Sequence, residues 1–504
     1  MHNHMKKPVF VIFGASGDLA RRKLLPALFR LFKNGSFPAG TLVLGAGRSS
    51  FTTVSYREML VNQSLLTGSS SVKERADAEK FLENVEYLVM DPSKKEDYTL
   101  LKERLITMNP GSDNYIFYMA TPPSLSEIIP HNLSFAGLNR SEKGERCARR
   151  VVVEKPFGYN LASATKINND LLSLFGEEQI YRIDHYLGKE TVQNILALRF
   201  SNTFFEPLWN RNYIDRVEIT AVENFGIGER GEFYERTGAL RDMVQNHLIQ
   251  LLALVAMEPP LSFNEKEFRD EVVKVLRALR PLNQQDIPSS VVRGQYIQTE
   301  GIKGYRQEKN VAPDSHTETF MAMKIFVDNW RWQGIPFYIR TGKQMPTKVS
   351  EIVIHFRPTP HKLFSGRGTK PEQNQLVIRI QPNEGLLLRI DMKIPGRGFE
   401  VGKAEMEFTY DKLGEYTSDD PYARLLLDCI SGDNTLFTRS DAVEASWNYF
   451  EPLLNYLRDN PDFPLYGYPA GTWGPPESNS IIEVAKGWTN PCKNLTNTDL
   501  YCEL

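Results

Sequence analysis

The stretch "VIFGASGDLARRKLLPALF" at residues 11–29 decides the fold of the N-terminal part of the chain. An apolar run ends at Gly14, and an amphipathic helical pattern starts near Asp18. Gly14, Gly17 and Ala20 follow the spacing G-x-x-G-x-x-A, a looser form of the dinucleotide-binding turn. Small residues there let backbone N–H groups approach a pyrophosphate, and the helix N-terminus favours its negative charge. An ordinary tight turn is the alternative interpretation.

The first 185 residues alternate short β-rich runs with helical patterns. Six apolar runs predict strands, at 8–14, 41–47, 85–91, 114–120, 149–155 and 179–184. Continuous apolar strands separated by helices are typical of a parallel sheet that is covered on both faces. The sequence therefore predicts an α/β, Rossmann-like, doubly wound domain at residues 1–184.

The pattern changes beyond about residue 185. Strand-like segments joined by short loops follow, at 213–224, 317–328, 337–343, 350–358, 375–382, 385–394 and 403–410. A helical insert is expected near 238–280, and helices at 421–431 and 440–457 are expected to close the chain. Clustered strands predict an α+β domain at residues 185–504, with a large, mainly antiparallel sheet and helices on one side.

Composition and charge exclude several classes of protein. The 504 residues carry 60 basic and 62 acidic side chains, a balance that argues against a general nucleic-acid-binding surface. No apolar run reaches the roughly 18 residues of a membrane span, and the start of the chain lacks a signal-peptide pattern. The four cysteines have no C-x-x-C spacing and are expected to be reduced thiols: Cys147, Cys429, Cys492 and Cys502. We expect a soluble cytoplasmic protein with no nucleic-acid or membrane partner.

The residue after the second predicted strand bears on the choice of dinucleotide. An NAD site usually has an aspartate or glutamate there, which binds the ribose hydroxyls. This chain has Arg48 instead, followed by Ser49 and Ser50. A guanidinium forms paired, charge-assisted hydrogen bonds to a 2′-phosphate. The sequence favours NADP, and a solvated surface arginine is the alternative.

Polar, titratable side chains crowd into "YRIDHYLGK" at residues 181–189, between a strand-like run and a helical pattern. The segment contains Asp184, His185, Tyr186 and Lys189. We interpret this crowding as a candidate functional site. The alternative is that Asp184 and His185 only cap the next helix.

A second polar group interrupts the helical pattern at residues 238–250. Asp242 and His247 lie five residues apart, which is roughly 140° around an α-helix. The two side chains are therefore not expected on one face, although they could line two sides of one pocket mouth. A buried histidine with satisfied hydrogen bonds is the alternative for His247.

Lys155 ends the fifth predicted strand, at the edge where open parallel sheets bind ligands. Pro156 follows it, which restricts Lys155 to extended geometry and allows a cis peptide bond. A structural lysine at a strand end is the alternative.

Seven motifs together resemble the glucose-6-phosphate dehydrogenase family. They are "GASGDLARRKLLP", "ATPPS", "EKPFG", "RIDHYLGKE", "RDMVQNHLIQ", "RTGK" and "YPAGTWGP", and they run in order from residue 14 to about 476. The resemblance implies oxidation of glucose 6-phosphate to 6-phosphogluconolactone with reduction of NADP, at the entry to the pentose phosphate pathway. NAD is implied as a weaker alternative coenzyme, and a homodimer or homotetramer as the assembly.

The resemblance also implies a role for each matching residue. His247 corresponds to the general base and Asp184 to the carboxylate that orients it. The matching substrate positions are Lys155, His185, Tyr186, Lys189, Glu223, Asp242, Lys343, Lys348 and Gln381. The matching coenzyme positions are Gly14, Ser16, Gly17, Asp18, Leu19, Arg48, Met90, Asp91 and Lys155. No metal is implied, and the histidines lack metal-ligand spacing.

Two rival functions stay open at this point. A different sugar oxidoreductase can also combine a dinucleotide domain with an antiparallel sheet, but "RIDHYLGK" suits a phosphorylated substrate. A non-catalytic NADP-binding sensor would be expected to lose the base or its carboxylate, yet Asp184 and His247 are both present.

Overall fold

The chain forms two compact units in a computed structural model. The first unit consists of Met1–Lys189, Ser262–Arg269 and Asp419–Glu444, and the second of Glu190–Leu261, Asp270–Ser418 and Ala445–Leu504. The residues that the structure describes are 7–66, 71–111, 113–141, 148–361, 363–364, 373–410, 420–484, 487–492 and 495. Among them, no helix has both the length and the apolar character needed to cross a bilayer.

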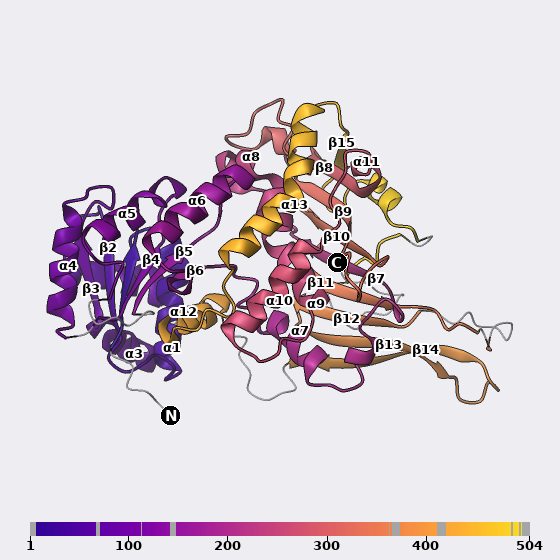
Figure 1. Cartoon of the computed structure of the whole chain (residues 1–504), viewed down its shortest axis with the longest axis horizontal. Helices are drawn as coiled ribbons and strands as arrows, with labels where there is room; N and C mark the ends of the chain where they lie inside the picture. The colour runs from indigo at the N-terminus through magenta and orange to yellow at the C-terminus, as the bar shows by residue number, and fades with distance from the viewer. Residues whose placement is uncertain are drawn as a thin grey trace. The chain divides into compact units, whose positions relative to one another are not determined.

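The first unit is built on a six-stranded parallel sheet with the order β3-β2-β1-β4-β5-β6 (Figure 1). Its strands are β1 (Val9–Phe13), β2 (Leu42–Gly47), β3 (Val85–Val89), β4 (Tyr115–Met119), β5 (Arg149–Val153) and β6 (Ile180–Arg182). The strand order reverses between β1 and β4, so right-handed crossovers place the connecting helices on opposite faces of the sheet. The predicted doubly wound fold is confirmed, with each strand within a few residues of its predicted range.

Helices connect these strands and cover the sheet. They are α1 (Leu25–Lys33), α2 (Thr53–Leu60), α3 (Val72–Glu83), α4 (Asp97–Met108), α5 (Ile128–Phe135) and α6 (Leu161–Leu174). A π-helical turn, η1 (Ala20–Leu24), precedes α1 directly after the glycine turn. The strand β1 is buried along its whole length, as expected for a central strand covered on both faces.

The second unit is built on a nine-stranded sheet with the order β14-β13-β12-β11-β7-β10-β9-β8-β15. Its strands are β7 (Ile214–Val222), β8 (Val291–Ile297), β9 (Phe320–Phe326), β10 (Pro336–Gly342), β11 (Val349–Phe356), β12 (Gln375–Gln381), β13 (Gly385–Lys393), β14 (Val401–Thr409) and β15 (Leu465–Pro469). Among the strand pairs of the described residues, only β7–β10 and β8–β15 are parallel, which confirms the predicted mainly antiparallel sheet. The sequence did not predict β8 and β15, which form one edge.

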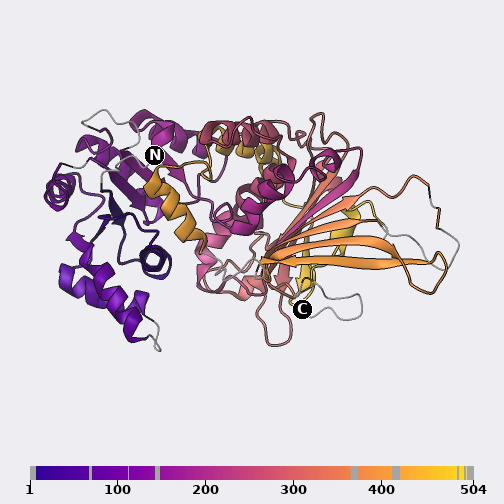
Figure 2. The same cartoon turned by 90° about the horizontal axis from the view of Figure 1, so that it is seen from below.

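Helices of the second unit lie against one face of this sheet (Figure 2). They include α7 (Glu190–Phe200), which packs on β12, and the π-helical segment η7 (Leu240–Leu248), which packs on β10. The other helices of the later chain are α8 (Gly231–Ala239), α9 (Ile249–Ala256), α10 (Glu265–Arg277), α11 (Ile287–Ser290), α12 (Pro421–Ser431) and α13 (Ser440–Asp459). Side chains of η7 therefore pack against the part of the sheet that contains β10.

The division between the units is discontinuous, whereas the sequence predicted a single cut between residues 184 and 185. The first unit keeps the chain as far as Lys189 and later takes in α12. This helix packs against α1, and its inward residues Leu425, Leu426 and Ile430 are almost fully buried. Burial of this apolar side assigns the helix to the first unit, although its position in the sequence suggested the second.

The cysteines follow the sequence expectation only in part. Cys429 is a buried free thiol, as expected for a reduced protein. Cys492 is disulfide-bonded, which corrects the expectation for that residue. Cys147 and Cys502 lie outside the described residues.

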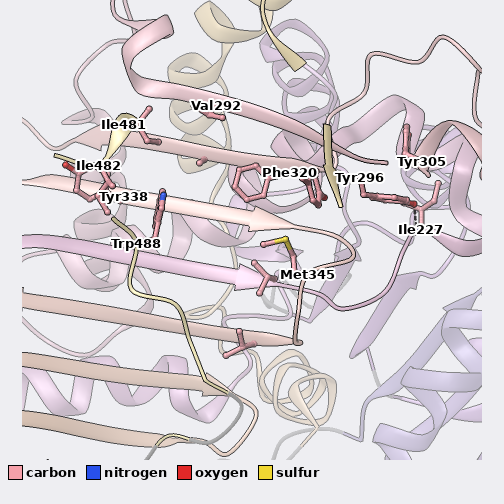
Figure 3. Close-up of a cluster of buried hydrophobic side chains, with 14 of the residues drawn as sticks. Ile227, Val292, Tyr296, Tyr305, Phe320, Tyr338, Met345, Ile481, Ile482 and Trp488 are labelled. Atoms are coloured by element: carbon pink, nitrogen blue, oxygen red, sulfur yellow. Dashed lines mark hydrogen bonds between the residues drawn. The ribbon is translucent and has the colours of Figure 1, made fainter. Parts of the chain in front are cut away.

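A cluster of buried aromatic and aliphatic side chains joins the β8 edge of the second sheet to the end of the chain (Figure 3). It includes Tyr296 from β8, Phe320 from β9 and Tyr338 from β10, with Ile481 and Trp488 from the C-terminal segment. Each of these five residues is at most 7% exposed. The cluster explains why Ile481, Ile482 and Trp488 lie against the sheet.

A buried ion pair in the second sheet makes the free energy of unfolding depend on pH in the acid range. Burial alone would raise the pKa of Glu218, but the hydrogen bond and charge of His355, with the charge of Arg216, lower it to about 2. A carboxyl whose folded pKa is depressed stabilises the fold above its unfolded pKa of 4.5, and this contribution is lost as pH falls toward about 2. We expect the free energy of unfolding to fall less steeply over this range in Glu218→Gln than in the wild type. Urea unfolding at several pH values measures the two slopes, and equal slopes would contradict the assignment.

Candidate active site

The glycine turn at the end of β1 approaches two neighbouring strands closely. The backbone N–H groups of Gly14 and Ala15 both donate to the carbonyl of Ala46 in β2, at 2.9 and 3.3 Å. Gly14 has φ +78°, and a Cβ there would overlap the carbonyl oxygen of Ala120, just after β4. The turn therefore lies at the β1–β4 switch point, where open α/β sheets bind their ligands.

The predicted coenzyme positions Ser16, Gly17, Asp18 and Leu19 follow in the same turn. The N–H of Gly17 donates to the carbonyl of Gly14 at 2.8 Å. Asp18 is exposed and forms a surface ion pair with Arg22, at 2.6 Å. The helix that follows Leu19 starts without a side-chain cap, so its first N–H groups suit an anionic ligand.

The loop after β2 lies beside this turn. The hydroxyls of Ser16 and Ser49 are 2.9 Å apart, which joins the glycine turn to the segment that carries Arg48. Arg48 is exposed, and its charge contributes, after hydrogen bonds from Ser93, to lowering the pKa of Asp91. Predicted residues from the first, second and third strand ends thus lie close together in the first unit.

Met90 is the least accessible of the predicted coenzyme positions. Its side chain is 2% exposed, and its N–H donates to the carbonyl of Gly47 at the end of β2, at 3.0 Å. The Met90 side chain therefore packs inside the first unit, directly after β3.

Lys155 follows β5 at the same end of the sheet. It is half-buried, and its bond to Pro156 is cis, as the sequence allowed. The preceding Glu154 accepts a hydrogen bond from the hydroxyl of Tyr118 at 2.5 Å. Burial raises the pKa of Glu154, and the Tyr118 hydrogen bond and the charge of Lys155 oppose this rise. Lys155 thus lies beside a partly buried carboxyl group that the sequence had not singled out.

The turn after β6 carries four predicted site residues. Asp184 is buried, and its Oδ1 accepts a hydrogen bond from the N–H of Tyr186 at 2.9 Å. The ring of Tyr186 lies 5.2 Å from the ring of His185 and 5.0 Å from Nζ of Lys189. Asp184 therefore stabilises the turn itself through this bond to Tyr186, while His185 and Lys189 stay partly accessible. An imidazole and an ammonium on one short turn suit an anionic ligand.

Tyr422 joins this turn from α12, and the sequence did not predict it. Its ring lies 6.4 Å from the ring of His185. Burial raises its pKa, and the charges of Glu154 and Asp184 add to the rise. A Cβ on Gly188 would meet the carbonyl oxygen of Pro421 at 2.5 Å, which explains the glycine in the motif. No local sequence pattern predicts this contact, because α12 is far from the turn in the sequence.

The segment η7 of the second unit corrects the predicted geometry of Asp242 and His247. Its hydrogen bonds are π-helical, and the N–H that closes it runs from Ile249 to the carbonyl of Val244, five residues back. Residues five apart therefore lie about one turn above each other, not 140° apart as an α-helix would place them. Asp242 is 7% and His247 1% exposed, so both side chains are buried. π-Helical segments often occur at functional sites.

Glu318 fixes the start of η7. Its Oε1 accepts a hydrogen bond from the N–H of Leu240 at 3.0 Å, and its backbone carbonyl accepts from the N–H of Ala239 at 2.9 Å. Gly238, just before, has φ +60° and ψ −176°, and a Cβ there would overlap the Glu318 carboxylate. The chain thus kinks at a position that only glycine fits, directly before the segment with Asp242.

We expect Gly238→Ala to lower the free energy of unfolding by at least about 1–3 kcal/mol, the cost of a strained backbone conformation. Turnover should fall too, because Glu318 must move away from η7. Gly301→Ala is the matched control, since Gly301 has φ +71° but nothing within 4 Å of a new Cβ. Urea unfolding of the two variants gives the comparison. Equal destabilisation would mean that the contact with Glu318 contributes nothing.

The remaining predicted substrate residues gather at one edge of the nine-stranded sheet. β7 and β10 are parallel and end there, and Glu223 and Lys343 follow them directly. The neighbouring β11 starts there, just after Lys348, and β12 ends there with Gln381. The parallel β7–β10 pair and the antiparallel pairs of β11 thus bring four segments of the chain to the same edge.

Ionic and ring contacts join these side chains. Glu223 and Lys343 form an ion pair, in which the Lys343 side chain is 3% exposed. The ammonium groups of Lys343 and Lys348 lie 5.4 and 5.7 Å from the ring of Phe225. Gln381 instead donates to the hydroxyl of Ser350 at 3.2 Å. The edge offers a carboxylate and two ammonium groups to a polar, anionic ligand.

The predicted site residues therefore form two groups, one in each unit. The first unit holds the glycine turn, the loop after β2, Lys155 and the turn from Asp184 to Lys189. The second unit holds Asp242, His247 and the residues of the sheet edge. The predicted pairing of Asp184 with His247 joins residues of different units and stays a prediction.

Comparisons with known proteins match both units. The family model "Glucose-6-phosphate dehydrogenase, NAD binding domain" matches residues 11–194, and "Glucose-6-phosphate dehydrogenase, C-terminal domain" matches residues 196–489. A glucose-6-phosphate 1-dehydrogenase of Aggregatibacter actinomycetemcomitans is 48% identical over 95% of this chain and 97% of its own. One of Treponema pallidum (strain Nichols) is 46% identical over 98% of both chains.

A solved structure is similar over almost the whole chain. It is a glucose-6-phosphate dehydrogenase in complex with its substrate glucose-6-phosphate, 36% identical, with a TM-score of 0.88. The match covers 97% of this chain and 100% of the other.

Proposed function

Because the chain belongs to the glucose-6-phosphate dehydrogenase family, we propose that it oxidises D-glucose 6-phosphate at C1. The product is 6-phospho-D-glucono-1,5-lactone, and the hydride passes to NADP⁺. The observation that carries the proposal is the full-length likeness to a relative solved with its substrate glucose-6-phosphate. The reaction would be the first step of the oxidative pentose phosphate pathway.

The coenzyme proposed is NADP, with NAD as a weaker alternative. The glycine turn and the N-terminus of the following helix suit the pyrophosphate. Arg48 stands where an NAD site usually has a carboxylate, and it is exposed beside Ser49. A guanidinium in that place favours the 2′-phosphate that distinguishes NADP from NAD. When bound, the nicotinamide ring supplies the hydride acceptor.

His247 acts as the general base in the proposed mechanism. Its neutral imidazole accepts the proton of the C1 hydroxyl as the hydride leaves C1. Asp184 accepts a hydrogen bond from the other ring nitrogen, which selects the tautomer and stabilises the imidazolium. Such a positioned base contributes about 10²–10⁴ in rate.

The other residues bind and orient the substrate. His185, Tyr186 and Lys189 bind the phosphate group, which supplies binding energy far from C1. Glu223 and Asp242 accept hydrogen bonds from sugar hydroxyls. The proposed neighbours of these groups are Lys155, between sugar and nicotinamide, and Lys343, Lys348 and Gln381 at the sheet edge.

When the purified protein is mixed with glucose 6-phosphate and NADP, the absorbance at 340 nm should increase as NADPH forms. Equal activity on free glucose would favour another sugar oxidoreductase, because the phosphate-binding turn would then contribute nothing. Binding of NADP without any absorbance change would favour a non-catalytic sensor.

The proposed assembly and location are tested separately. Analytical sedimentation of the purified protein tests the proposed homodimer or homotetramer, and cell fractionation tests the cytoplasmic location.

A further inference from the structure

Tyr234 in α8 is a buried phenol whose hydroxyl lacks a hydrogen-bond partner. The residue is 1% exposed, and its hydroxyl oxygen has no partner among the described residues. Leaving a buried hydroxyl unpaired is unfavourable, and most such groups in native proteins are paired. A phenylalanine would fill the same space without that cost. The hydroxyl therefore needs a partner that the described part of the chain does not supply.

The surroundings of this hydroxyl are those of the proposed sugar site. The carboxylates of Asp242, Glu318 and Glu223 are close enough to act on its titration. Nζ of Lys343 lies 5.5 Å from the centre of the Tyr234 ring, and the same ammonium is paired with Glu223. Tyr234 thus adjoins two residues proposed to bind sugar hydroxyls and one proposed to bind the substrate beside them.

The hydroxyl keeps its proton in this environment. Burial raises the pKa of Tyr234 well above its ordinary value, and the charges of Asp242 and Glu318 add to the rise. The group can therefore donate a hydrogen bond at any physiological pH. A neutral donor next to carboxylate acceptors complements a sugar, whose hydroxyl groups both donate and accept.

We infer that Tyr234 is a further substrate-binding residue, which donates its phenolic hydrogen bond to a hydroxyl oxygen of the bound sugar. This inference rests on the proposed function, and it adds a contact that discriminates among sugars by their hydroxyl pattern. The hydroxyl is satisfied only in the complex, so the free protein tolerates an unpaired group that the substrate then pairs.

Tyr305 provides the matched control within the same aromatic cluster (Figure 3). Its ring contacts the ring of Tyr234 edge-on, with centroids 6.0 Å apart, and it is fully buried. Its hydroxyl, however, donates to Glu235 at 2.6 Å. Within the described residues, Tyr305 therefore has a hydrogen-bond partner and Tyr234 has none, while both rings are buried in the same cluster.

The two tyrosine-to-phenylalanine variants should behave in opposite ways. We expect Tyr234→Phe to raise KM for glucose 6-phosphate about three- to tenfold, the value of one neutral hydrogen bond. Its kcat should change less and its melting temperature should stay the same or rise. Tyr305→Phe should lower the melting temperature and leave KM unchanged, because it removes a bond within the protein.

Deoxy analogues of glucose 6-phosphate identify the partner hydroxyl. The KM penalty of Tyr234→Phe should vanish with the one analogue, 2-, 3- or 4-deoxy, that lacks the contacted group, and persist with the others. Calorimetric binding of glucose 6-phosphate to each variant gives the same comparison without turnover. An unchanged KM and affinity, or a lower melting temperature in Tyr234→Phe, would overturn the inference and assign the hydroxyl to an internal water or a structural role. An inactive wild type that binds no sugar phosphate would instead overturn the proposed function.

Discussion

His247→Asn is expected to lower kcat at least about a hundredfold, the low end of the contribution of a positioned base. Asparagine is polar and smaller than histidine, so it fits a position that is 1% exposed, but it cannot accept the C1 proton. KM for glucose 6-phosphate should change little, because the phosphate and the sugar hydroxyls keep their proposed partners. Near-normal turnover would end the assignment of His247.

His355→Asn is the control for this experiment, since His355 is a second buried histidine of the same unit. It bonds to Glu218 in the sheet at 2.9 Å, and no catalytic role is proposed for it. His355→Asn should lose stability and keep its kcat. His247→Asn should keep its stability and lose kcat. The pH profile adds a further test, because the wild-type rate should fall as the base is protonated in acid and the rate of His247→Asn should not.

Arg48→Asp should shift the coenzyme preference strongly toward NAD. Loss of charge-assisted hydrogen bonds to a 2′-phosphate is expected to raise KM for NADP at least about tenfold. The new carboxylate repels that phosphate and can bind the ribose hydroxyls of NAD, so KM for NAD should rise little or fall. Arg48 is exposed, so the substitution should not disturb packing.

The charge reversal itself needs a control at another exposed arginine of the first unit. Arg140→Asp serves, since Arg140 follows α5 and is exposed. It should leave both Michaelis constants unchanged. If Arg48→Asp changes KM for NADP and for NAD by the same factor, Arg48 does not read the 2′-phosphate.

The sequence predicted the first sheet well for a physical reason. Each strand of a parallel sheet buried on both faces is a short apolar run, and turn residues mark its end. The same reasoning missed β8 and β15, since "VVRGQYI" and "LYGYP" contain charge, glycine or proline. These strands form because the chain returns to pair at the sheet edge and to pack on the cluster around Phe320.

The candidate site was predicted as far as local motifs reach. Asp184, His185 and Lys189 share one turn, so their proximity follows from the sequence alone. The predicted angle between Asp242 and His247 around the helix was wrong, because the 3.6-residue period of an α-helix does not hold in a π-helical segment. Tyr234 and Tyr422 were missed because neither belongs to a recognisable sequence motif. The structure identifies Tyr234 by its buried, unpaired hydroxyl among the described residues, and Tyr422 by the contact of α12 with His185.

The late position of α12 in the chain has a consequence for biosynthesis. Because this helix covers part of α1, the N-terminal unit is incomplete until residues beyond 419 leave the ribosome. A nascent chain therefore carries an uncovered apolar strip through most of translation, and chaperones recognise such strips. Fragments truncated before α12 would keep that strip exposed and should be removed by proteases or aggregate.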